Sequence, residues 1–195
     1  MFTEKQLKDL LKAQSDLNNA YVNNWIKEVP LSKWLCAFQC EWAEFLESTP
    51  RFYGHKWWKP TLEDDVQNSK VEIVDMLHFG LSIALLKNTD FDYNSVLDDF
   101  NDLKDDKDLS LERSQKAFIL TCHTGIEGTN EKFLSVFFYL LFTLCEYVHW
   151  NFDDLYNAYW KKNELNLQRI RGGYMEGKYQ KVDNNGNEDN RKLDL

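Results

Sequence analysis

Apolar residues recur every three or four positions along most of the chain, and no stretch alternates apolar and polar residues over a useful length. The first spacing is typical of amphipathic helices, whereas the second would indicate strands. Val29-Pro30 and Thr49-Pro50 separate helical stretches because proline lacks the amide hydrogen that a helix interior needs. We expect helices over residues 3–27, 32–48, 63–87, 111–121, 130–148 and 152–162. The pattern therefore predicts an all-α helical bundle.

The most apolar stretch, FLSVFFYLLFTLCEYV, lies within residues 130–148. It is too short, and too close to Glu131, Lys132 and Glu146, to span a bilayer. A helix that is apolar all round must be buried, either at the centre of the bundle or in a dimer interface. For such an interface, FLSVFFYLLF is the best candidate surface.

Two segments depart from the helical pattern. Residues 89–110 include six aspartates between Asp98 and Asp108, beside two lysines, and we interpret them as an exposed, variable excursion. Residues 161–195 form a basic C-terminal segment that contains glycine and tyrosine. We therefore expect residues 1–195 to form a single all-α domain with these two appendages.

Composition and charge limit the function further. The chain has 195 residues, of which 43% are hydrophobic, enough for one domain with a sizeable core. Its formal net charge of −9 argues against general binding to nucleic acid or to an anionic membrane surface. The four cysteines form no CxxC pair, and the chain opens directly into a polar amphipathic run. We therefore expect no signal peptide and a reducing, cytoplasmic compartment.

Two pairs of acidic residues, Glu41 with Glu44 and Glu72 with Asp75, fall at i and i+3 among apolar residues of two predicted helices. This spacing puts both members of a pair on one helix face. Four acids that converge near a buried face are costly to hold together unless a cation lies between them. Oxygen ligands suit Mg²⁺, with Mn²⁺ as an alternative. The pairs therefore predict a metal site for phosphate chemistry; the alternative is that the acids are solvated at the helix margins.

Residues 161–181 carry six basic residues against two acidic ones, a local net charge of +4. Gly172-Gly173 and Gly177 alternate with Tyr174 and Tyr179, which favours an irregular loop that can approach an anion closely. The alternative is a solvated terminal segment. Together with the acidic pairs, these basic residues would complete a polyphosphate-binding site.

Three further features have both a structural and a functional interpretation. Gln14 and Asn18, two amides at i and i+4, either lie on the surface or read the edge of a nucleobase. His78 is either a hydrogen-bonded core histidine or a substrate contact. Trp57 and Trp58 either pack within a linker or stack on a base.

These residues lie in motifs that resemble the dimeric, all-α dUTP diphosphatases of the MazG-like nucleotide pyrophosphohydrolase superfamily. The whole superfamily shares the acidic pairs, whereas the basic C-terminal signature is narrower and points to the dUTP-specific branch. The resemblance runs almost from end to end and rests on LLKAQSDLN (10–18), CEWAE (40–44), KWWK (56–59), KVEIVDMLHF (70–79), KNELNLQR (162–169), GYMEGKYQK (173–181) and NGNEDN (185–190).

The resemblance implies a homodimer that hydrolyses dUTP to dUMP and pyrophosphate with Mg²⁺, with dUDP as a further candidate substrate, and so limits uracil incorporation into DNA. It favours attack at the β phosphorus. It implies Mg²⁺ ligation by Glu41, Glu44, Glu72 and Asp75. The implied substrate contacts are uracil selection by Gln14 and Asn18 with help from Trp58, sugar contacts from His78 and Asn166, and phosphate contacts from Lys162, Arg169, Tyr174 and Lys181.

For the chemical step, Glu44 is the first candidate to deprotonate the attacking water, and Glu41 is the second. Three alternatives stay open. One is a related pyrophosphatase for dCTP or a modified nucleotide. Another is a carboxylate-bridged di-iron bundle, suggested by two acid–histidine pairs at i and i+3, Asp75 with His78 and Glu146 with His149. The third is a non-catalytic helical interaction module.

Overall fold

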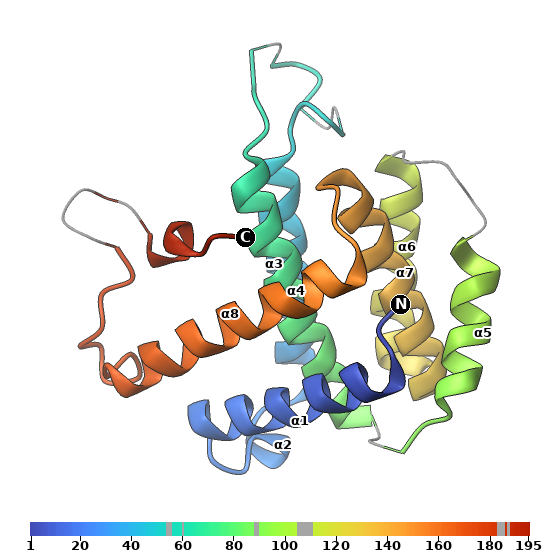
Figure 1. Ribbon diagram of the computed structural model, residues 1–195, viewed down its shortest axis with the longest axis horizontal. Helices are drawn as coiled ribbons and strands as arrows, with labels where there is room; N and C mark the ends of the chain where they lie inside the picture. Colours follow the sequence, from blue (N-terminus) through green and yellow to red (C-terminus); the bar gives the residue numbers. More distant parts are fainter. Residues whose placement is uncertain (54–55, 60, 88–89, 105–110, 183–185, 187) are drawn as a thin grey trace.

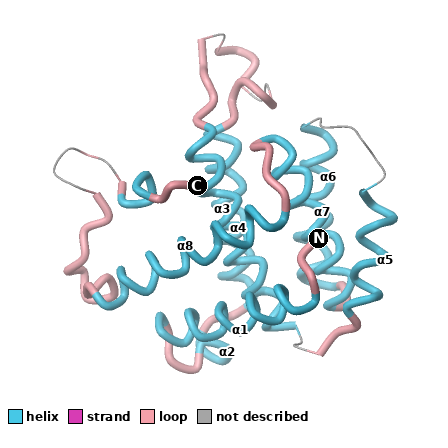
Figure 2. The backbone as a smooth tube through the Cα atoms, in the orientation of Figure 1, coloured by secondary structure: helices cyan, strands magenta, loops and turns pink. Residues whose placement is uncertain are grey.

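The computed structural model describes the chain except for residues 54–55, 60, 88–89, 105–110, 183–185 and 187. Figure 2 shows helices and loops in the described part, without a strand, so the all-α prediction is confirmed. The elements, arranged as in Figure 1, are α1 (Glu4–Tyr21), α2 (Trp25–Glu28), α3 (Leu31–Ser48), α4 (Val66–Lys87), α5 (Tyr93–Lys104), α6 (Leu111–Glu127), α7 (Asn130–Tyr147), α8 (Phe152–Arg171) and the 3₁₀ helix η1 (Asp189–Lys192).

Helix α7 lies in the core and packs against α4, α5, α6 and α8. Every residue from 133 to 141 is buried. Of the two alternatives for FLSVFFYLLF, burial at the centre of the bundle is confirmed. The segment does not form a dimer surface, because neighbouring helices of the same chain already cover it. The packing is close: a Cβ added to Gly80 of α4 would lie only 2.1 Å from Phe137 Cζ.

Helices α3 and α4 pack antiparallel and position the predicted metal site. Ser48 Oγ lies 2.9 Å from Ser69 Oγ near one end of the pair, and Glu41 faces Glu72 and Asp75 nearer its middle. Most of α4 is buried because α1, α3, α7 and α8 all contact it. Acids on this helix are therefore held against the core rather than in bulk water.

The first helix is shorter than expected. It begins with a capping box in which Thr3 Oγ1 accepts from Gln6 N at 3.2 Å and Gln6 Oε1 accepts from Thr3 N at 2.9 Å. It ends at Tyr21 rather than near residue 27. Asn24 adopts a left-handed backbone conformation with φ of 57°, which breaks the helix before the buried Trp25 starts α2.

The excursion predicted over residues 89–110 contains an unexpected helix, α5. Val96 and Phe100 are buried, and α5 packs against α7, whereas Asp98 and Asp102 are exposed. Helix α5 is therefore amphipathic, and Asp98 and Asp102 lie on its solvent-exposed face. Residues 105–110 of the excursion lie outside the described residues.

Two later helices run beyond their predicted ends. Helix α6 continues through Gly125 to Glu127. A glycine inside a helix lowers its stability by only about 1 kcal/mol relative to alanine, and close packing of Gly125 against Leu35 favours the helix at this point. Helix α8 continues to Arg171, since residues 163–171 contain neither glycine nor proline. The extension of α8 changes the site, because residues assigned to an irregular tail are instead placed by helical geometry.

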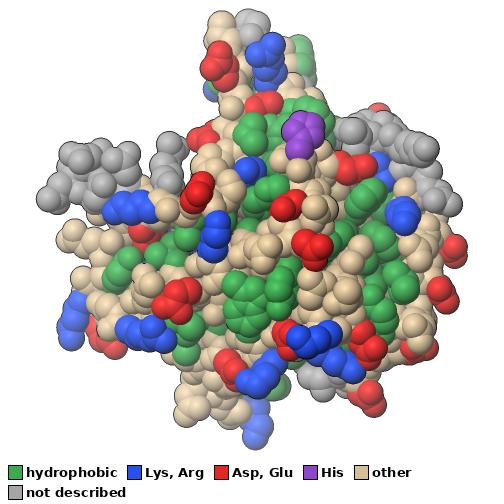
Figure 3. All heavy atoms as spheres, in the orientation of Figure 1, with side chains coloured by type: hydrophobic (Ala, Val, Ile, Leu, Met, Phe, Trp, Pro, Cys, Tyr) green, Lys and Arg blue, Asp and Glu red, His purple; other side chains and the backbone are tan. Residues whose placement is uncertain are grey.

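Among the described residues, no single helix is both long and apolar enough to cross a membrane. Helices α7 and α8 pass that test only as a pair, and the pair is bent by 95°. Figure 3 shows acidic and basic side chains interspersed over one face of the molecule, not gathered into a basic patch. On that face, the distribution agrees with the argument from net charge against general nucleic-acid binding.

Candidate active site

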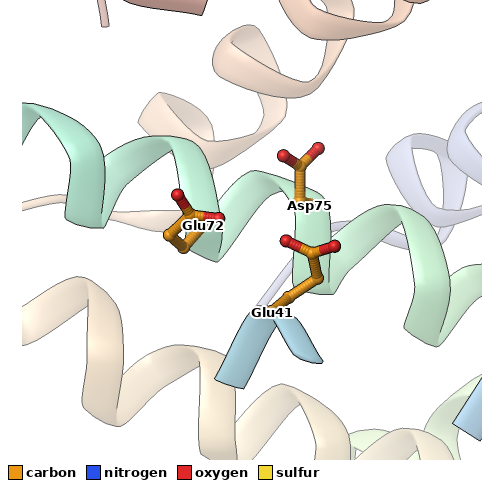
Figure 4. Close-up of side chains that lie close together, drawn as sticks. All are labelled: Glu41, Glu72 and Asp75. Carbon is orange, nitrogen blue, oxygen red and sulfur yellow. The ribbon is translucent and has the colours of Figure 1, made fainter. Parts of the chain in front are cut away.

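Three carboxylates from two helices meet on one side of the α3–α4 pair (Figure 4). Glu41 comes from α3, whereas Glu72 and Asp75 come from successive turns of α4. Each offers one oxygen, and these three oxygens lie within 4.8 Å of one another. Such an all-oxygen donor set fits a hard divalent cation such as Mg²⁺ or Mn²⁺.

Crowding changes the protonation of these acids. Burial, and next the charge of Asp75, raise the pKa of Glu72 to about 9 and that of Glu41 to about 7. Near neutral pH the metal-free cluster therefore keeps a proton that a divalent cation would displace. The raised pKa values of Glu41 and Glu72 indicate a site where negative charge is crowded, and such a site favours binding of a cation.

Glu44 lies one turn beyond Glu41 on α3. It is exposed and stands outside the group of three carboxylates. After burial and the charge of Asp75, its own charge is still among the causes that raise the pKa of Glu41 and Glu72. Glu44 thus belongs to the rim of the cluster, where a carboxylate can meet both solvent and substrate.

Helix α8 brings Lys162, Asn166 and Arg169 to one face by their i, i+4, i+7 spacing. Lys162 is 1% exposed, and its Nζ donates to Asp75 Oδ2 at 2.7 Å. Arg169 is also buried, and its Nη1 donates to Asn166 Oδ1 at 3.0 Å. The α8 face therefore sets two cationic groups beside the acidic cluster.

Two residues that sequence reasoning gave no role, Asp189 and Asn190, hold the same cations from η1. The Asp189 oxygens accept from Arg169 Nη2 at 2.5 Å and from Arg169 Nε at 3.1 Å, a bidentate pair. Asn190 Oδ1 accepts from Lys162 Nζ at 3.0 Å and from Arg169 Nη2 at 2.7 Å. The NGNEDN motif was the signal that could have drawn attention to them.

The amides of Gln14 and Asn18 are buried where α1 faces α4, so the interpretation that they lie on the surface is wrong. Gln14 Nε2 donates to Asn18 Oδ1 at 2.8 Å, and Asn18 Nδ2 donates to Ser82 Oγ at 2.9 Å. His78 Nδ1 lies 2.7 Å from Gln14 Oε1. Burial, and next the charge of Lys162, lower the pKa of His78 to about 3, so its imidazole is neutral.

A glycine-containing turn follows α8, as predicted. Gly173 and Gly177 have φ values of 84° and 69°, which side chains with a Cβ rarely adopt. The turn brings Tyr174 and Lys181 together, with Lys181 Nζ 5.0 Å from the centre of the Tyr174 ring.

A cavity of about 330 Å³ joins these groups, a volume typical of small-molecule sites. Its wall also contains Leu17, Tyr21, Trp34 and Phe79, which were not predicted as site residues. The predicted site residues that line it are Gln14, Asn18, Glu41, Asp75, His78, Asn166, Arg169, Tyr174 and Lys181.

Other predicted residues lie elsewhere. Trp58 is 58% exposed in the loop between α3 and α4 and does not line the cavity, and Trp57 is 83% exposed. The base-stacking role of Trp58 stays a prediction. Two acid–histidine pairs suggested a di-iron site. Asp75 of the first pair belongs to the group of three acids, whereas in the second pair Glu146 lies 3.4 Å from Arg113 and His149 is exposed, so that pair does not join them.

Comparison with known proteins agrees with this arrangement. The dUTPase family model matches residues 6–174, or 169 of the 195 residues. A search of the curated proteins gave no match. The matched range contains the acidic cluster, the α1 amides and the α8 cations. The chain therefore belongs to the all-α dUTPase family, and its activity is that of a dUTP diphosphatase.

Proposed function

We propose that this dUTP diphosphatase uses Mg²⁺, with Mn²⁺ as an alternative, to convert dUTP to dUMP and pyrophosphate in the cavity between α1, α3, α4 and α8. The observation that carries the proposal is that three different chemistries face one cavity. Carboxylates suited to a cation, basic groups suited to phosphate, and amides suited to a base all line it or adjoin it.

Glu41, Glu72 and Asp75 would hold the cation, with Glu44 completing the set from the rim. When bound, a divalent cation neutralises phosphate charge and lowers the pKa of a water molecule. Glu44 is our candidate for the general base because it is exposed beside the cluster. Glu41 is the second candidate.

The α8 residues and the turn after it would hold the triphosphate. Lys162 and Arg169 are buried cations, and each can donate to phosphate oxygens without first being stripped of bulk water. Tyr174 and Lys181 would close the same side, since both line the cavity. His78 and Asn166, in the same wall, are our candidates for sugar contacts.

The reaction proposed is attack of water on the β phosphorus of dUTP. The water oxygen bonds to phosphorus, the bridging oxygen leaves with its electron pair on dUMP, and the proton goes to Glu44. Hydrolysis in ¹⁸O-labelled water tests this assignment, since the label must appear in pyrophosphate. Label in dUMP would place the attack on the α phosphorus.

The decisive experiment measures pyrophosphate release from dUTP with and without Mg²⁺ for Glu44→Ala and Asp75→Ala. We expect both variants to fold and to lose turnover by at least about a thousandfold. Glu47→Gln is the matched control, an exposed acid on the same helix that pairs with Lys56 outside the cavity. Near-normal release by either alanine variant would contradict the assignment.

A panel of dUTP, dCTP, dTTP and UTP tests the remaining alternative of a dCTP or modified-nucleotide pyrophosphatase, and adding dUDP tests the second substrate. We also propose a homodimer. Its contact surface differs from FLSVFFYLLF, which is core. Light scattering on the eluting protein would measure its mass.

A further inference from the structure

The hydroxyl of Tyr159 on α8 sits against the amide of Gln14 and determines which way that amide points. Asn163 Nδ2 donates to the hydroxyl at 3.2 Å, so the hydroxyl's own proton is available for an acceptor. Gln14 Oε1 lies 3.1 Å away, while the Leu10 carbonyl oxygen is more distant at 3.5 Å. The hydroxyl donates to Gln14 Oε1, and this hydrogen bond favours the orientation in which the amide oxygen of Gln14 faces Tyr159.

The position of His78 is consistent with this orientation of the Gln14 amide. Its Nδ1 lies 2.7 Å from the same Gln14 oxygen, which can only accept. The neutral imidazole therefore carries its proton on Nδ1. With Gln14 Oε1 turned toward Tyr159 and His78, the Gln14 NH₂ group points to Asn18 Oδ1 at 2.8 Å.

Ser82 on α4 fixes the orientation of the Asn18 amide in the same way. Its hydroxyl donates to the carbonyl oxygen of His78, one turn earlier on the helix, at 2.9 Å. The hydroxyl then accepts from Asn18 Nδ2, also at 2.9 Å. Each amide is thus held at both ends by partners whose donor and acceptor roles are already decided.

The orientation of an amide matters for the choice of base. Uracil offers a carbonyl oxygen and an N–H at the edge where cytosine offers an amino group and an unprotonated nitrogen. Turning a side-chain amide by 180° exchanges its NH₂ and oxygen, and so converts a match for one base into a match for the other. A residue that prevents this rotation controls specificity even where it never touches the nucleotide.

We propose that Tyr159 and Ser82 are positioning residues that make the site select uracil over cytosine, by holding Gln14 and Asn18 in one amide orientation. The inference rests on the proposed base-reading role of those two amides. Gln14 and Asn18 line the cavity, whereas Tyr159 and Ser82 stand behind them and do not. Tyr159 and Ser82 have no exposed surface, so water cannot replace their hydrogen bonds.

The test compares kcat/KM for dUTP and for dCTP, with Mg²⁺, in the wild type, Tyr159→Phe and Ser82→Ala. Loss of one orienting hydrogen bond should lower the dUTP-to-dCTP ratio by about tenfold. Ser82→Thr keeps a hydroxyl and should restore most of the ratio. Tyr156→Phe, on the same helix but outside the cavity wall, is the matched control and should leave the ratio unchanged.

Thermal unfolding of each variant separates specificity from folding, and Ser82→Ala carries the test if Tyr159→Phe does not fold. A folded variant that loses dUTP and dCTP turnover equally, or keeps the wild-type ratio, overturns the proposal. Gln14→Ala and Asn18→Ala distinguish the base-reading role of these two amides from the positioning role of Tyr159 and Ser82. If these keep the wild-type ratio, the base-reading assignment fails. If they lose it while Tyr159→Phe and Ser82→Ala keep it, only the positioning role fails.

Discussion

Binding of Mg²⁺ to the nucleotide-free protein should release between one and two protons per site at pH 7. Burial and the charge of Asp75 raise the pKa of Glu72 to about 9, so this carboxyl is almost fully protonated at neutral pH. Ionising it at pH 7 costs about 3 kcal/mol, from two pH units at 1.36 kcal/mol each. Glu41, with a pKa of about 7, shares the same cluster; it is half protonated at pH 7 and adds about half a proton.

Because between one and two protons leave as the cation binds, the apparent Kd for Mg²⁺ should fall by at least about tenfold for each pH unit between pH 6 and 8. Lys162, whose Nζ lies 2.7 Å from Asp75 Oδ2, offsets only part of the negative charge. The remaining repulsion among three acids is what the cation relieves.

Isothermal titration calorimetry in buffers of different ionisation heat measures the number of protons directly. The slope of observed enthalpy against buffer ionisation enthalpy should correspond to between one and two protons released. Glu72→Gln is the control, since it cannot ionise and should bind Mg²⁺ more weakly with a flatter dependence on pH. An enthalpy that is independent of the buffer, together with a Kd that is independent of pH, would contradict the predicted protonation of Glu72 and Glu41.

Three more predictions follow from the same structure. The free energy of unfolding of the metal-free protein should fall as pH rises from about 5 to 9, because the folded state holds the Glu72 proton more tightly than the unfolded state. Thermal melts measure this trend, and saturating Mg²⁺ should remove it. Gly80→Ala should lower the free energy of unfolding by about 1–3 kcal/mol, since its Cβ would meet Phe137 at 2.1 Å and the clash outweighs the helix-propensity gain; denaturant melts with an unchanged midpoint would contradict this. Arg169→Lys loses the two-pronged contact with Asp189 and should raise KM for dUTP about tenfold with the fold intact, as measured by steady-state kinetics and circular dichroism.

Most of the long helices could be predicted from periodicity, but helix α5 and several helix ends could not. The run after residue 162 looked like a basic tail because its charges dominate the local composition, yet nothing in it stops a helix before Gly172. Burial of Val96 and Phe100 against the core stabilises α5. The aspartates Asp98 and Asp102 do not oppose this packing, because they lie on the solvent-exposed side of the helix. Composition averages over a segment, whereas burial depends on which side of the helix each residue occupies.

The amino-acid sequence alone predicts that the chain is helical, that its acids pair at i and i+3, and which family it resembles. These are local or pattern properties, written in spacing and residue type. Only the tertiary structure decided that Glu41 reaches Glu72 and Asp75 while Glu44 stays at the rim, and that Asp189 pairs with Arg169. Contacts between residues far apart in the chain depend on how the helices pack, and no local spacing encodes that packing.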